Sequence, residues 1–400
     1  MADYDVAIVG GGCIGCSTAK HLAERSELEI CLLEKEYHLA THQSGRNSGV
    51  LHPGFNYPPG SLKARFSTEG TRRMKAYFDE HDLPLEHTGV LVVATTDREE
   101  RRLSDLQAQA TENGVETEIV TGESAVREYE PHARGQAALY CPEAASVDSQ
   151  QYVYQLAADA KASGVDFYVG HRVDGIDFDG EHAITTSKGT VTASYLINAA
   201  GLHADRIAAE VGVGRGYQIV PFRGEYYELV PGTEDVCQSM IYPTPDPDLP
   251  FLGVHYTRRT DGKVIVGPNA VLAFGRESYR NTEVNLRDLA ETLSYGGFWK
   301  LMASREMASV AWDELNKSYR KQRFVEAARR LVPSVREEDF ARSYAGVRAQ
   351  LLDADGNLIK DPMLTDGPRS LHVLNAVSPG LTSSLPFGDH VAETALEALE

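Results

Sequence analysis

The sequence predicts an α/β fold with two domains, one wound around a Rossmann-like parallel sheet and one built on a mainly antiparallel sheet with helices. Three observations predict this class. A glycine-rich turn joins a strand to a helix at the start of the chain, strand-and-helix units recur in its middle and at its end, and strand-rich segments separate them. Because the wound units lie far apart in the chain, we expect the first domain to be discontinuous.

The first unit contains a Gly-x-Gly-x-x-Gly motif. Asp5 to Val9 is a short apolar run typical of a buried strand, and Cys16 to Arg25 carries apolar residues at helical intervals. Gly10 permits the tight turn, Gly12 lets the backbone approach a pyrophosphate, and Gly15 lets the helix pack close to the strand. The motif therefore predicts a dinucleotide site at the amino end of this helix.

An acidic residue follows at the expected distance. The second strand, Glu29 to Leu33, is followed by Glu34, which stands 19 residues after Gly15 and can accept hydrogen bonds from a ribose diol. The same segment offers an alternative, because Cys13 and Cys16 form a Cys-x-x-Cys pair at a helix amino end, where thiolates are stabilised. We favour the interpretation that both cysteines are small structural residues, since the glycine spacing already explains the segment. Cys31, Cys141 and Cys237 are isolated and are expected to be plain thiols.

Later segments extend both domains. Residues 41–64 form a long polar, glycine- and proline-rich passage, and loops of this kind often hold ligands. Tyr195 to Ala200 reads as a buried strand that leads into a helix near His203, and Leu371 to Asn375 reads as a strand before a glycine turn and a closing helix, Leu385 to Leu399. Strand-rich stretches at 220–230, 250–257 and 263–268, with amphipathic helices around 284–332, predict the covering domain.

We place the domain boundaries accordingly. The cofactor-binding domain is expected to comprise residues 1–80, 145–215 and 340–400, and the substrate-binding domain residues 81–144 and 216–339.

Composition restricts the possible partners. The 400 residues carry 58 acidic and 39 basic side chains, a net charge of −19, which argues against a nucleic-acid surface and against broad binding to anionic lipid. The acidic surplus fits either an ordinary soluble protein or adaptation to a salty interior. Five scattered cysteines and no signal-peptide pattern fit a reducing cytoplasm, and no apolar run approaches a membrane span. We expect no metal site.

Several motifs together resemble one known family. The chain is similar, over nearly its whole length, to the L-2-hydroxyglutarate dehydrogenase/oxidase family, a branch of the D-amino-acid-oxidase-like FAD-dependent oxidoreductases. The motifs are GGGCIG, EK at 34–35, HQSGRNSGVLHPGFNYPPGSLKA, PFRGEYYEL, PTPDPDLPFLGVH, VGPNAVLAF, AGVRAQ and NAVSPGLTSS. The chain has Arg46 where the family commonly shows His. The resemblance implies FAD as cofactor and oxidation of L-2-hydroxyglutarate to 2-oxoglutarate, with hydride passing from substrate C2 to flavin N5.

The resemblance also assigns cofactor contacts. Gly10, Gly12 and Gly15 would hold the pyrophosphate and Glu34, beside Lys35, the adenosine ribose. Further residues that the resemblance implies near the pyrophosphate, adenine and flavin are Ser44, Asn47, Ser48, Val173, Gly201, Gly380, Leu381 and Thr382.

Substrate and catalytic residues follow from the chemistry. A dicarboxylate requires cations of defined geometry, and Arg348 matches a family position for a substrate carboxylate. Arg223, Lys63 and Tyr57 are weaker candidates for the second carboxylate. His52 is the favoured base and His255 the reserve, since a neutral imidazole suits removal of a hydroxyl proton.

Three alternatives remain open at this stage. The first is a related flavoenzyme acting on an amino acid or glycerol 3-phosphate, the second an NAD-linked dehydrogenase, and the third a non-catalytic flavin-binding protein. Electrons would leave to a quinone, another respiratory carrier or oxygen. The resemblance implies electron delivery to the respiratory chain at the cytoplasmic face of the membrane, which would need peripheral attachment. The oligomeric state stays open.

Overall fold

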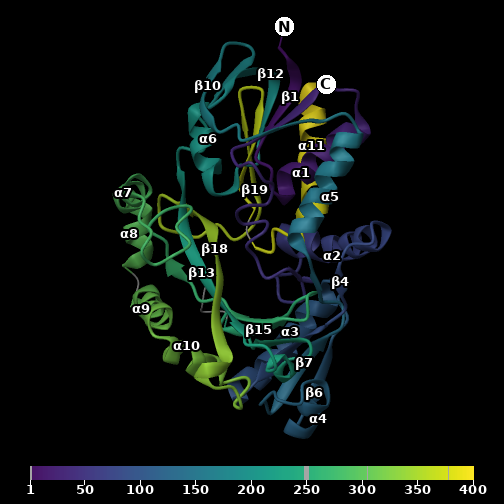
Figure 1. Cartoon of the computed structure of the whole chain (residues 1–400), viewed down its shortest axis with the longest axis vertical. Helices are drawn as coiled ribbons and strands as arrows, with labels where there is room; N and C mark the ends of the chain where they lie inside the picture. Colours follow the sequence, from purple (N-terminus) through teal and green to yellow (C-terminus); the bar gives the residue numbers. More distant parts are fainter. Residues whose placement is uncertain (1, 247–251, 304, 377) are drawn as a thin grey trace.

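The protein contains two large β-sheets with helices packed around them (Figure 1), which confirms the predicted α/β class. This computed structural model describes residues 2–246, 252–303, 305–376 and 378–400.

The first sheet has a parallel centre in the order β9-β2-β1-β12-β20. Strands β10, β11 and β19 extend it in antiparallel fashion. Its strands are β1 (Tyr4–Val9), β2 (Ile30–Glu34), β9 (Asp166–Val169), β10 (Val173–Phe178), β11 (His182–Thr186), β12 (Gly189–Asn198), β19 (Met363–Gly367) and β20 (Ser370–Asn375).

Both faces of this sheet are covered. Helices α1 (Cys13–Arg25), α5 (Ser149–Ala162) and α11 (Ser384–Leu399) pack together on one face and share a single hydrophobic core with β1 and β2. Ile176, Ile184 and Ile207 cover the other face. Burial on both sides explains why the central strands read as continuous apolar runs rather than as alternating ones.

The second sheet is mainly antiparallel, as expected, although β14 and β5 pair in parallel. Its order is β17-β13-β16-β15-β14-β5-β7-β6, and β18 pairs with β13. Its strands are β5 (Val90–Ala94), β6 (Glu118–Thr121), β7 (Ala137–Cys141), β13 (Tyr217–Leu229), β14 (Met240–Pro243), β15 (His255–Arg258), β16 (Val264–Gly267), β17 (Val271–Leu272) and β18 (Phe340–Asp353).

A small third sheet, β3-β8-β4, consists of β3 (Val50–Leu51), β4 (Leu85–Glu86) and β8 (Ala145–Val147). The remaining helices are α2 (Leu62–Glu80), α3 (Asp97–Glu112), α4 (Glu123–Tyr129), α6 (Ala204–Glu210), α7 (Leu286–Ser294), α8 (Gly296–Met302), α9 (Arg305–Tyr319) and α10 (Lys321–Ala328), with single 3-10 turns at Gly201–His203, Glu234–Val236 and Glu337–Asp339.

Several details differ from the sequence-based expectation. Helix α1 begins at Cys13 rather than Cys16, directly after Gly12. Strand β18 begins at residue 340, where the cofactor-binding domain was expected to resume. It nevertheless pairs along its length with β13 of the second sheet. The expected strand at 250–257 is described only from 252, and position 377 of the carboxy-terminal turn lies outside the described residues. In the part of the chain that the structure describes, no helix combines the length and apolarity needed to cross a membrane.

Candidate active site

One cavity of about 1590 Å³ runs between elements of the two large sheets. The glycine turn, the loop that starts at Ala40, the start of β10, the end of β12, strand β18 and the turn at 378–381 all contribute to its wall. Of the predicted residues, those that line it are Gly10, Gly12, Glu34, Lys35, Ser44, Asn47, Ser48, His52, Tyr57, Lys63, Val173, Gly201, His255, Arg348, Gly380 and Leu381. A cavity of this volume can hold a dinucleotide together with a small substrate.

The glycine turn has the geometry that a bound pyrophosphate requires. Gly12 caps α1, and a Cβ on it would lie 2.9 Å from the Ser44 hydroxyl oxygen. A Cβ on Gly15 would lie 1.9 Å from the carbonyl oxygen of Gly10, so Gly15 is needed for helix–strand packing and does not itself line the cavity. The amino end of α1 lines the cavity, through Gly12, Cys13 and Ile14.

Glu34 both lines the cavity and fixes the turn. Its carboxylate accepts hydrogen bonds from the backbone N–H groups of Gly11 and Glu36, each at 2.8 Å. A carboxylate oxygen has a second lone pair, so these bonds leave acceptor capacity for a ribose hydroxyl.

Val173 is the first residue of β10, and Gly201 adopts a positive φ of 54°.

Lys35 lies in a cluster of charged groups at the cavity wall. Its ammonium forms an ion pair with Glu36. The same nitrogen lies 2.7 Å from His42 Nε2 and 2.7 Å from Glu277 Oε1. Burial raises the pKa of Glu277, but hydrogen bonds from His203 and Lys35 outweigh it and hold that pKa well below its ordinary value. Glu36, His42 and Glu277 have metal-ligand atoms within 4.8 Å of one another. The lysine cation already compensates these carboxylates, so the cluster reads as an ion-pair network.

Ser44 and Asn47 hold the loop together. The Ser44 hydroxyl accepts from the backbone N–H of Cys13 at 3.0 Å, which ties the loop to the start of α1. The Asn47 amide donates to the carbonyls of Gln43 and Ser44 and accepts from the N–H of Gly49. The Asn47 side chain thus fixes the loop's shape, while the neighbouring Ser48 lines the same wall.

The turn before α11 reaches the same wall. Gly380 and Leu381 line the cavity, whereas Thr382 is fully buried behind them. The Thr382 hydroxyl accepts from the backbone N–H of His52 at 3.0 Å and donates to the carbonyl of Val50 at 3.2 Å. Thr382 therefore positions strand β3 and His52 and is absent from the cavity lining.

Two histidines lie together at one end of the cavity. The ring of Tyr242 is 4.2 Å from that of His255 and 6.0 Å from that of His52, between centroids. Burial, with a smaller contribution from Lys63, lowers the pKa of His52 to about 4, and burial lowers the pKa of His255 to about 3. His255 Nδ1 lies 2.9 Å from the carbonyl oxygen of Gly253, which places its proton on that nitrogen and leaves Nε2 as an acceptor.

Cationic groups accompany these histidines. The Arg348 charge acts on both His255 and Tyr226. The Lys63 ammonium lies 4.6 Å from the centre of the Tyr57 ring, and burial lowers its pKa to about 8 against the opposing charge of Asp361. A buried ammonium with a lowered pKa is favourably placed to receive an anionic ligand.

The structure places Arg223 on β13 and away from the cavity wall. It is 3% exposed and is absent from the cavity lining. Its guanidinium forms an ion pair with Glu225 at 3.2 Å and donates to the carbonyl of Arg280 at 3.1 Å and to Asn281. Because these partners use its donors inside the second domain, Arg223 is not a candidate for binding a substrate carboxylate.

Many residues of this wall were not predicted, and Tyr226, Tyr242 and Arg46 are three of them. Tyr226 and Tyr242 line the cavity beside the histidines, and Arg46 lines it farther along the loop. The alternation of β13 around Tyr226 was a usable signal, since alternate residues of a strand share a face. Arg46 donates to the carbonyl of Thr41 at 3.0 Å and lies 4.1 Å from the ring centre of Tyr279.

The cysteine pair does not have the surroundings of a reactive dithiol. Cys13 and Cys16 are both buried free thiols, and burial raises the pKa of each above its ordinary value. A reactive thiol needs a lowered pKa and access to its partner, so the structural interpretation of this pair is favoured.

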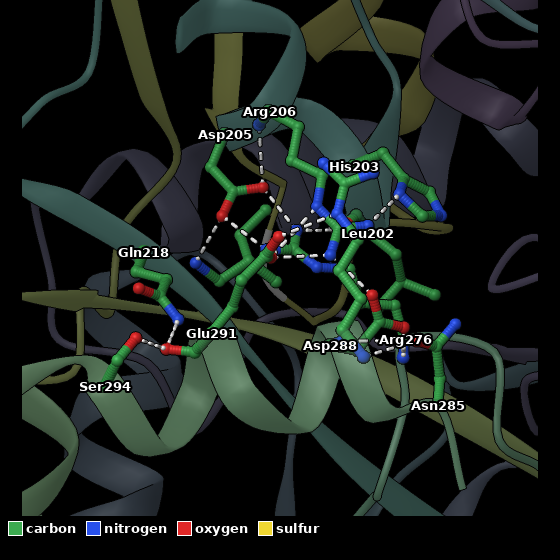
Figure 2. A network of polar contacts seen from close by, with 12 residues as sticks. Leu202, His203, Asp205, Arg206, Gln218, Arg276, Asn285, Asp288, Glu291 and Ser294 are labelled. Carbon is green, nitrogen blue, oxygen red and sulfur yellow. Dashed lines mark hydrogen bonds and ion pairs between the residues drawn. The ribbon is translucent and has the colours of Figure 1, made fainter. Parts of the chain in front are cut away.

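A buried ion network braces the cavity where α6 meets α7 (Figure 2). Arg276 binds both carboxylate oxygens of Asp205, and its backbone N–H donates to Asp288 at 2.8 Å. Arg206 donates to Asp288 and Glu291, each at 2.5 Å. The network therefore connects α6, the helix after β12, to α7 and to the loop before it.

The fold and the cavity define a class of protein, and sequence comparison agrees. A family model described as FAD dependent oxidoreductase matches residues 5–394, and the chain belongs to that family. The glycine turn before α1, the Glu34 carboxylate and a cavity of this volume fit its cofactor, FAD. A match over nearly the whole chain does not favour the NAD-linked alternative, which shares only the first motif.

The relatives narrow the class further. The chain is 39% identical over 399 residues to an L-2-hydroxyglutarate dehydrogenase of Indibacter alkaliphilus, covering 99% of each chain. It is 40% identical to the mitochondrial L-2-hydroxyglutarate dehydrogenase of Nematostella vectensis, covering 98% of this chain and 91% of that one. These relatives place the chain in the L-2-hydroxyglutarate dehydrogenase branch.

A solved structure shows the same fold. L-α-glycerophosphate oxidase from Mycoplasma pneumoniae, with FAD bound, has a TM-score of 0.76 at 23% identity, covering 99% of this chain and 94% of that one.

Proposed function

We propose that this protein oxidises L-2-hydroxyglutarate to 2-oxoglutarate with FAD as its cofactor. The relatives named for this activity support the proposal, since they cover nearly the whole chain at 39–40% identity. The observation in the structure that carries it is the group of His52, His255, Lys63 and Arg348, which line the cavity and lie close enough for the charge of Lys63 to act on His52 and that of Arg348 on His255.

The cations support a dianionic substrate. We assign Arg348 to the carboxylate next to the reacting carbon, because its charge acts directly on His255. Lys63 is the remaining candidate for the distal carboxylate, with Tyr57 beside it. Charge-assisted hydrogen bonds from both ends would fix the position of C2 between them.

The base is assigned to an imidazole. When bound, the flavin supplies the acceptor for the hydride that leaves substrate C2. We propose His52 as the group that takes the hydroxyl proton, because its backbone is held by Thr382 at the turn that the family resemblance assigns to the flavin. His255 is the reserve, and its fixed tautomer presents Nε2 as an acceptor. The low pKa of both imidazoles keeps them neutral near pH 7, as a base requires.

The experiment is a substrate panel with an artificial electron acceptor. Purified holoprotein is offered L- and D-2-hydroxyglutarate, glycerol 3-phosphate and a set of amino acids, and 2-oxoglutarate is quantified. We expect turnover of L-2-hydroxyglutarate, with one 2-oxoglutarate formed for each molecule of substrate consumed. Preferential turnover of glycerol 3-phosphate or an amino acid would assign the protein to another reaction of the same fold. Flavin that stays oxidised with every compound would indicate a binding protein.

The electron acceptor and the location belong to the same proposal. We propose that electrons leave to a quinone or to oxygen, and that the enzyme works in the cytoplasm, either free or attached peripherally to the membrane. Hydrogen peroxide formed in step with 2-oxoglutarate would identify oxygen as the acceptor. Turnover that needs an added quinone and yields no peroxide would identify the quinone.

A further inference from the structure

The loop between β17 and α7 reaches from the second sheet to the cofactor side of the cavity. The backbone N–H of Asn285 donates to the carbonyl of Phe274 at 2.8 Å, which closes this loop at its base. Loops of about 6 to 16 residues whose ends meet are compact and frequently functional. We call residues 274–285 the clamp loop.

The backbone of the clamp loop is anchored at two points. The guanidinium of Arg276 binds both carboxylate oxygens of Asp205 (Figure 2). The buried Arg223 donates to the carbonyl of Arg280 at 3.1 Å. Residues 277–279, which lie between these anchors, are therefore fixed at both ends.

The clamp loop faces a long loop that follows strand β2. Residues 35–49 connect β2 to β3, and most of them line the cavity. The Ser44 hydroxyl accepts from the backbone N–H of Cys13 at 3.0 Å, and the backbone N–H of Ala40 donates to the carbonyl of Gly11 at 3.3 Å. We call residues 35–49 the cofactor loop, because these bonds tie it to the glycine turn. A displacement of this loop would change the wall that we assign to the pyrophosphate.

Glu277 contacts the start of the cofactor loop. Its Oε1 atom lies 2.7 Å from Lys35 Nζ and 2.8 Å from His203 Nε2, and all three residues line the cavity. A carboxylate at this wall repels the phosphates of a dinucleotide. A favourable contribution of Glu277 to cofactor binding therefore has to act through Lys35.

Tyr279 contacts the middle of the cofactor loop. Its hydroxyl lies 2.5 Å from His42 Nδ1, and the guanidinium carbon of Arg46 lies 4.1 Å from the centre of its ring. A cation over an aromatic face is attracted to it. The ring also packs against the small hydrophobic cluster that contains Leu202 and Val347. Tyr279 therefore holds the cofactor loop from a side chain that is itself held.

We propose that Glu277 and Tyr279 are positioning residues for the cofactor, which hold the cofactor loop against bound FAD and slow its release. An ion pair, a polar contact and a cation–π contact join the anchored backbone of the clamp loop to the cofactor loop at the wall of one cavity. The proposal rests on FAD as the cofactor and is independent of the substrate.

The test measures FAD release from full-length holoprotein. After dilution, the fluorescence of the freed FAD gives the rate of release, and thermal unfolding with FAD in excess confirms that each variant folds. Glu277→Gln should release FAD about tenfold faster, because the charge-assisted contact to Lys35 is lost. Direct repulsion alone predicts the opposite sign, since removal of a negative charge near the phosphates would slow the release.

Further variants separate the clamp from a change of charge. Tyr279→Phe removes the hydroxyl contact and keeps the ring, so FAD release should be about fivefold faster, and Tyr279→Ala should release FAD faster still. Lys35→Met with Glu277→Gln should release FAD no faster than Lys35→Met alone, because one contact cannot be lost twice. Arg280→Gln, at an 82% exposed side chain of the clamp loop, is the matched control and should release FAD at the unaltered rate.

Amide hydrogen exchange gives a second readout in the intact holoprotein. Residues 35–49 should exchange faster in Glu277→Gln and in Tyr279→Phe, because the cofactor loop opens more often when a contact to the clamp loop is missing. Helix α5, which lies outside both loops, should exchange as in the unaltered protein.

Four results would overturn the proposal. They are unchanged or slower FAD release in Glu277→Gln, unchanged exchange of the cofactor loop, additive effects of Lys35→Met and Glu277→Gln, and an Arg280→Gln effect as large as that of Glu277→Gln. Turnover of L-2-hydroxyglutarate is measured separately. Absent turnover together with the expected pattern of FAD release would contradict the proposed function alone.

Discussion

At the scale of single residues, the two imidazoles at the end of the cavity are held in different ways. His255 is fixed through its ring, by the carbonyl of Gly253, whereas His52 is fixed through its backbone, by the Thr382 hydroxyl. A fixed tautomer defines which nitrogen accepts a proton, and a fixed backbone places the ring without defining the tautomer. The rates of flavin reduction in a His52 variant and a His255 variant therefore separate the roles of the two residues.

The first prediction concerns the base. His52→Asn should retain FAD but be reduced by L-2-hydroxyglutarate about 10² to 10⁴-fold more slowly, because the hydroxyl proton loses its acceptor. His255→Asn should be impaired less. Anaerobic stopped-flow absorbance measures both rates, with flavin content as the control. Normal reduction of His52→Asn, or a larger defect in His255→Asn, would transfer the role to His255.

The second prediction concerns Arg348. Arg348→Met should keep its flavin and weaken apparent affinity for L-2-hydroxyglutarate about ten- to a hundredfold, since a charge-assisted hydrogen bond is worth about 1.5 to 3 kcal/mol. Arg342→Met, on the same strand but exposed, is the control. Steady-state KM and substrate titration of the oxidised flavin provide the readouts. Equal losses in both variants would indicate a general electrostatic effect instead of a carboxylate contact.

Most of the residues that the sequence proposed for the site line the cavity, but the sequence did not show the partners that decide their roles. Arg223 and Arg348 both occur in motifs shared with the family, and only the structure shows that Glu225 and Asn281 use the guanidinium of Arg223. Tyr242 was missed because its neighbours His52 and His255 lie far from it in the chain, where no spacing rule relates them.

At the scale of elements, the Asp205–Arg276 pair connects α6 to the loop before α7 (Figure 2). Both side chains are buried, with Arg276 3% and Asp205 8% exposed. Asp205 also accepts from the backbone N–H of Ile219 at 2.9 Å, so it orients the start of β13 as well. Loss of one partner would leave a buried charge without compensation.

The third prediction tests this brace. Arg276→Met should lower the free energy of unfolding by about 3 to 5 kcal/mol, because Asp205 is left unpaired. Arg287→Met, which removes an exposed i,i+4 ion pair with Glu291 in the same region, should change it by less than about 1 kcal/mol. Urea unfolding of the holoprotein measures both values. Similar small changes in the two variants would show that the buried pair contributes little.

Elements with strong local signals were predictable. The apolar runs of β1, β2 and β20 and the closing helix α11 were located within one residue, whereas β12 begins six residues before the expected Tyr195. Helix α1 begins three residues earlier than expected, because its first turn contains Gly15 and packs against Gly10. The short strands β3, β4 and β8 gave no usable pattern, since two or three residues show no periodicity.

At the scale of the whole molecule, the buried His255 and His372 and the half-buried His52 relate stability to pH. The pKa values of His52 and His372 are lowered to about 4 and that of His255 to about 3, in each case chiefly by burial. In the unfolded chain a histidine has a pKa near about 6.5. Between these values the unfolded chain binds more protons than the native protein, so the free energy of unfolding rises with pH up to about 6.5.

The fourth prediction follows from this linkage. The melting temperature should fall as pH is lowered from 7 to about 5. In His255→Asn the free energy of unfolding should depend less steeply on pH, by up to about 1.4 kcal/mol per pH unit. His38→Asn, at an exposed histidine, controls for the exchange itself. Thermal unfolding at several pH values with FAD in fixed excess gives the slopes. A slope for His255→Asn equal to that of the control would contradict the burial argument.

The pairing of strands that lie far apart in the chain could not be predicted from the sequence. Recurring wound units predicted a cofactor domain assembled from separate pieces, and local runs predicted strands around 220 and 264. The second sheet recruits β5, β6 and β7 from residues 90–141 through the parallel β5–β14 pair, which joins segments about 150 residues apart. Strand β18 likewise joins this sheet from beyond the expected boundary at 340.

The reductive half-reaction tests the central claim most directly. Purified holoprotein is mixed anaerobically with L- or D-2-hydroxyglutarate, and the oxidised flavin absorbance is followed while 2-oxoglutarate is quantified. The account predicts bleaching by the L-enantiomer, with one 2-oxoglutarate formed per flavin reduced, and no comparable bleaching by the D-enantiomer. Bleaching by D- and not by L-2-hydroxyglutarate would contradict it.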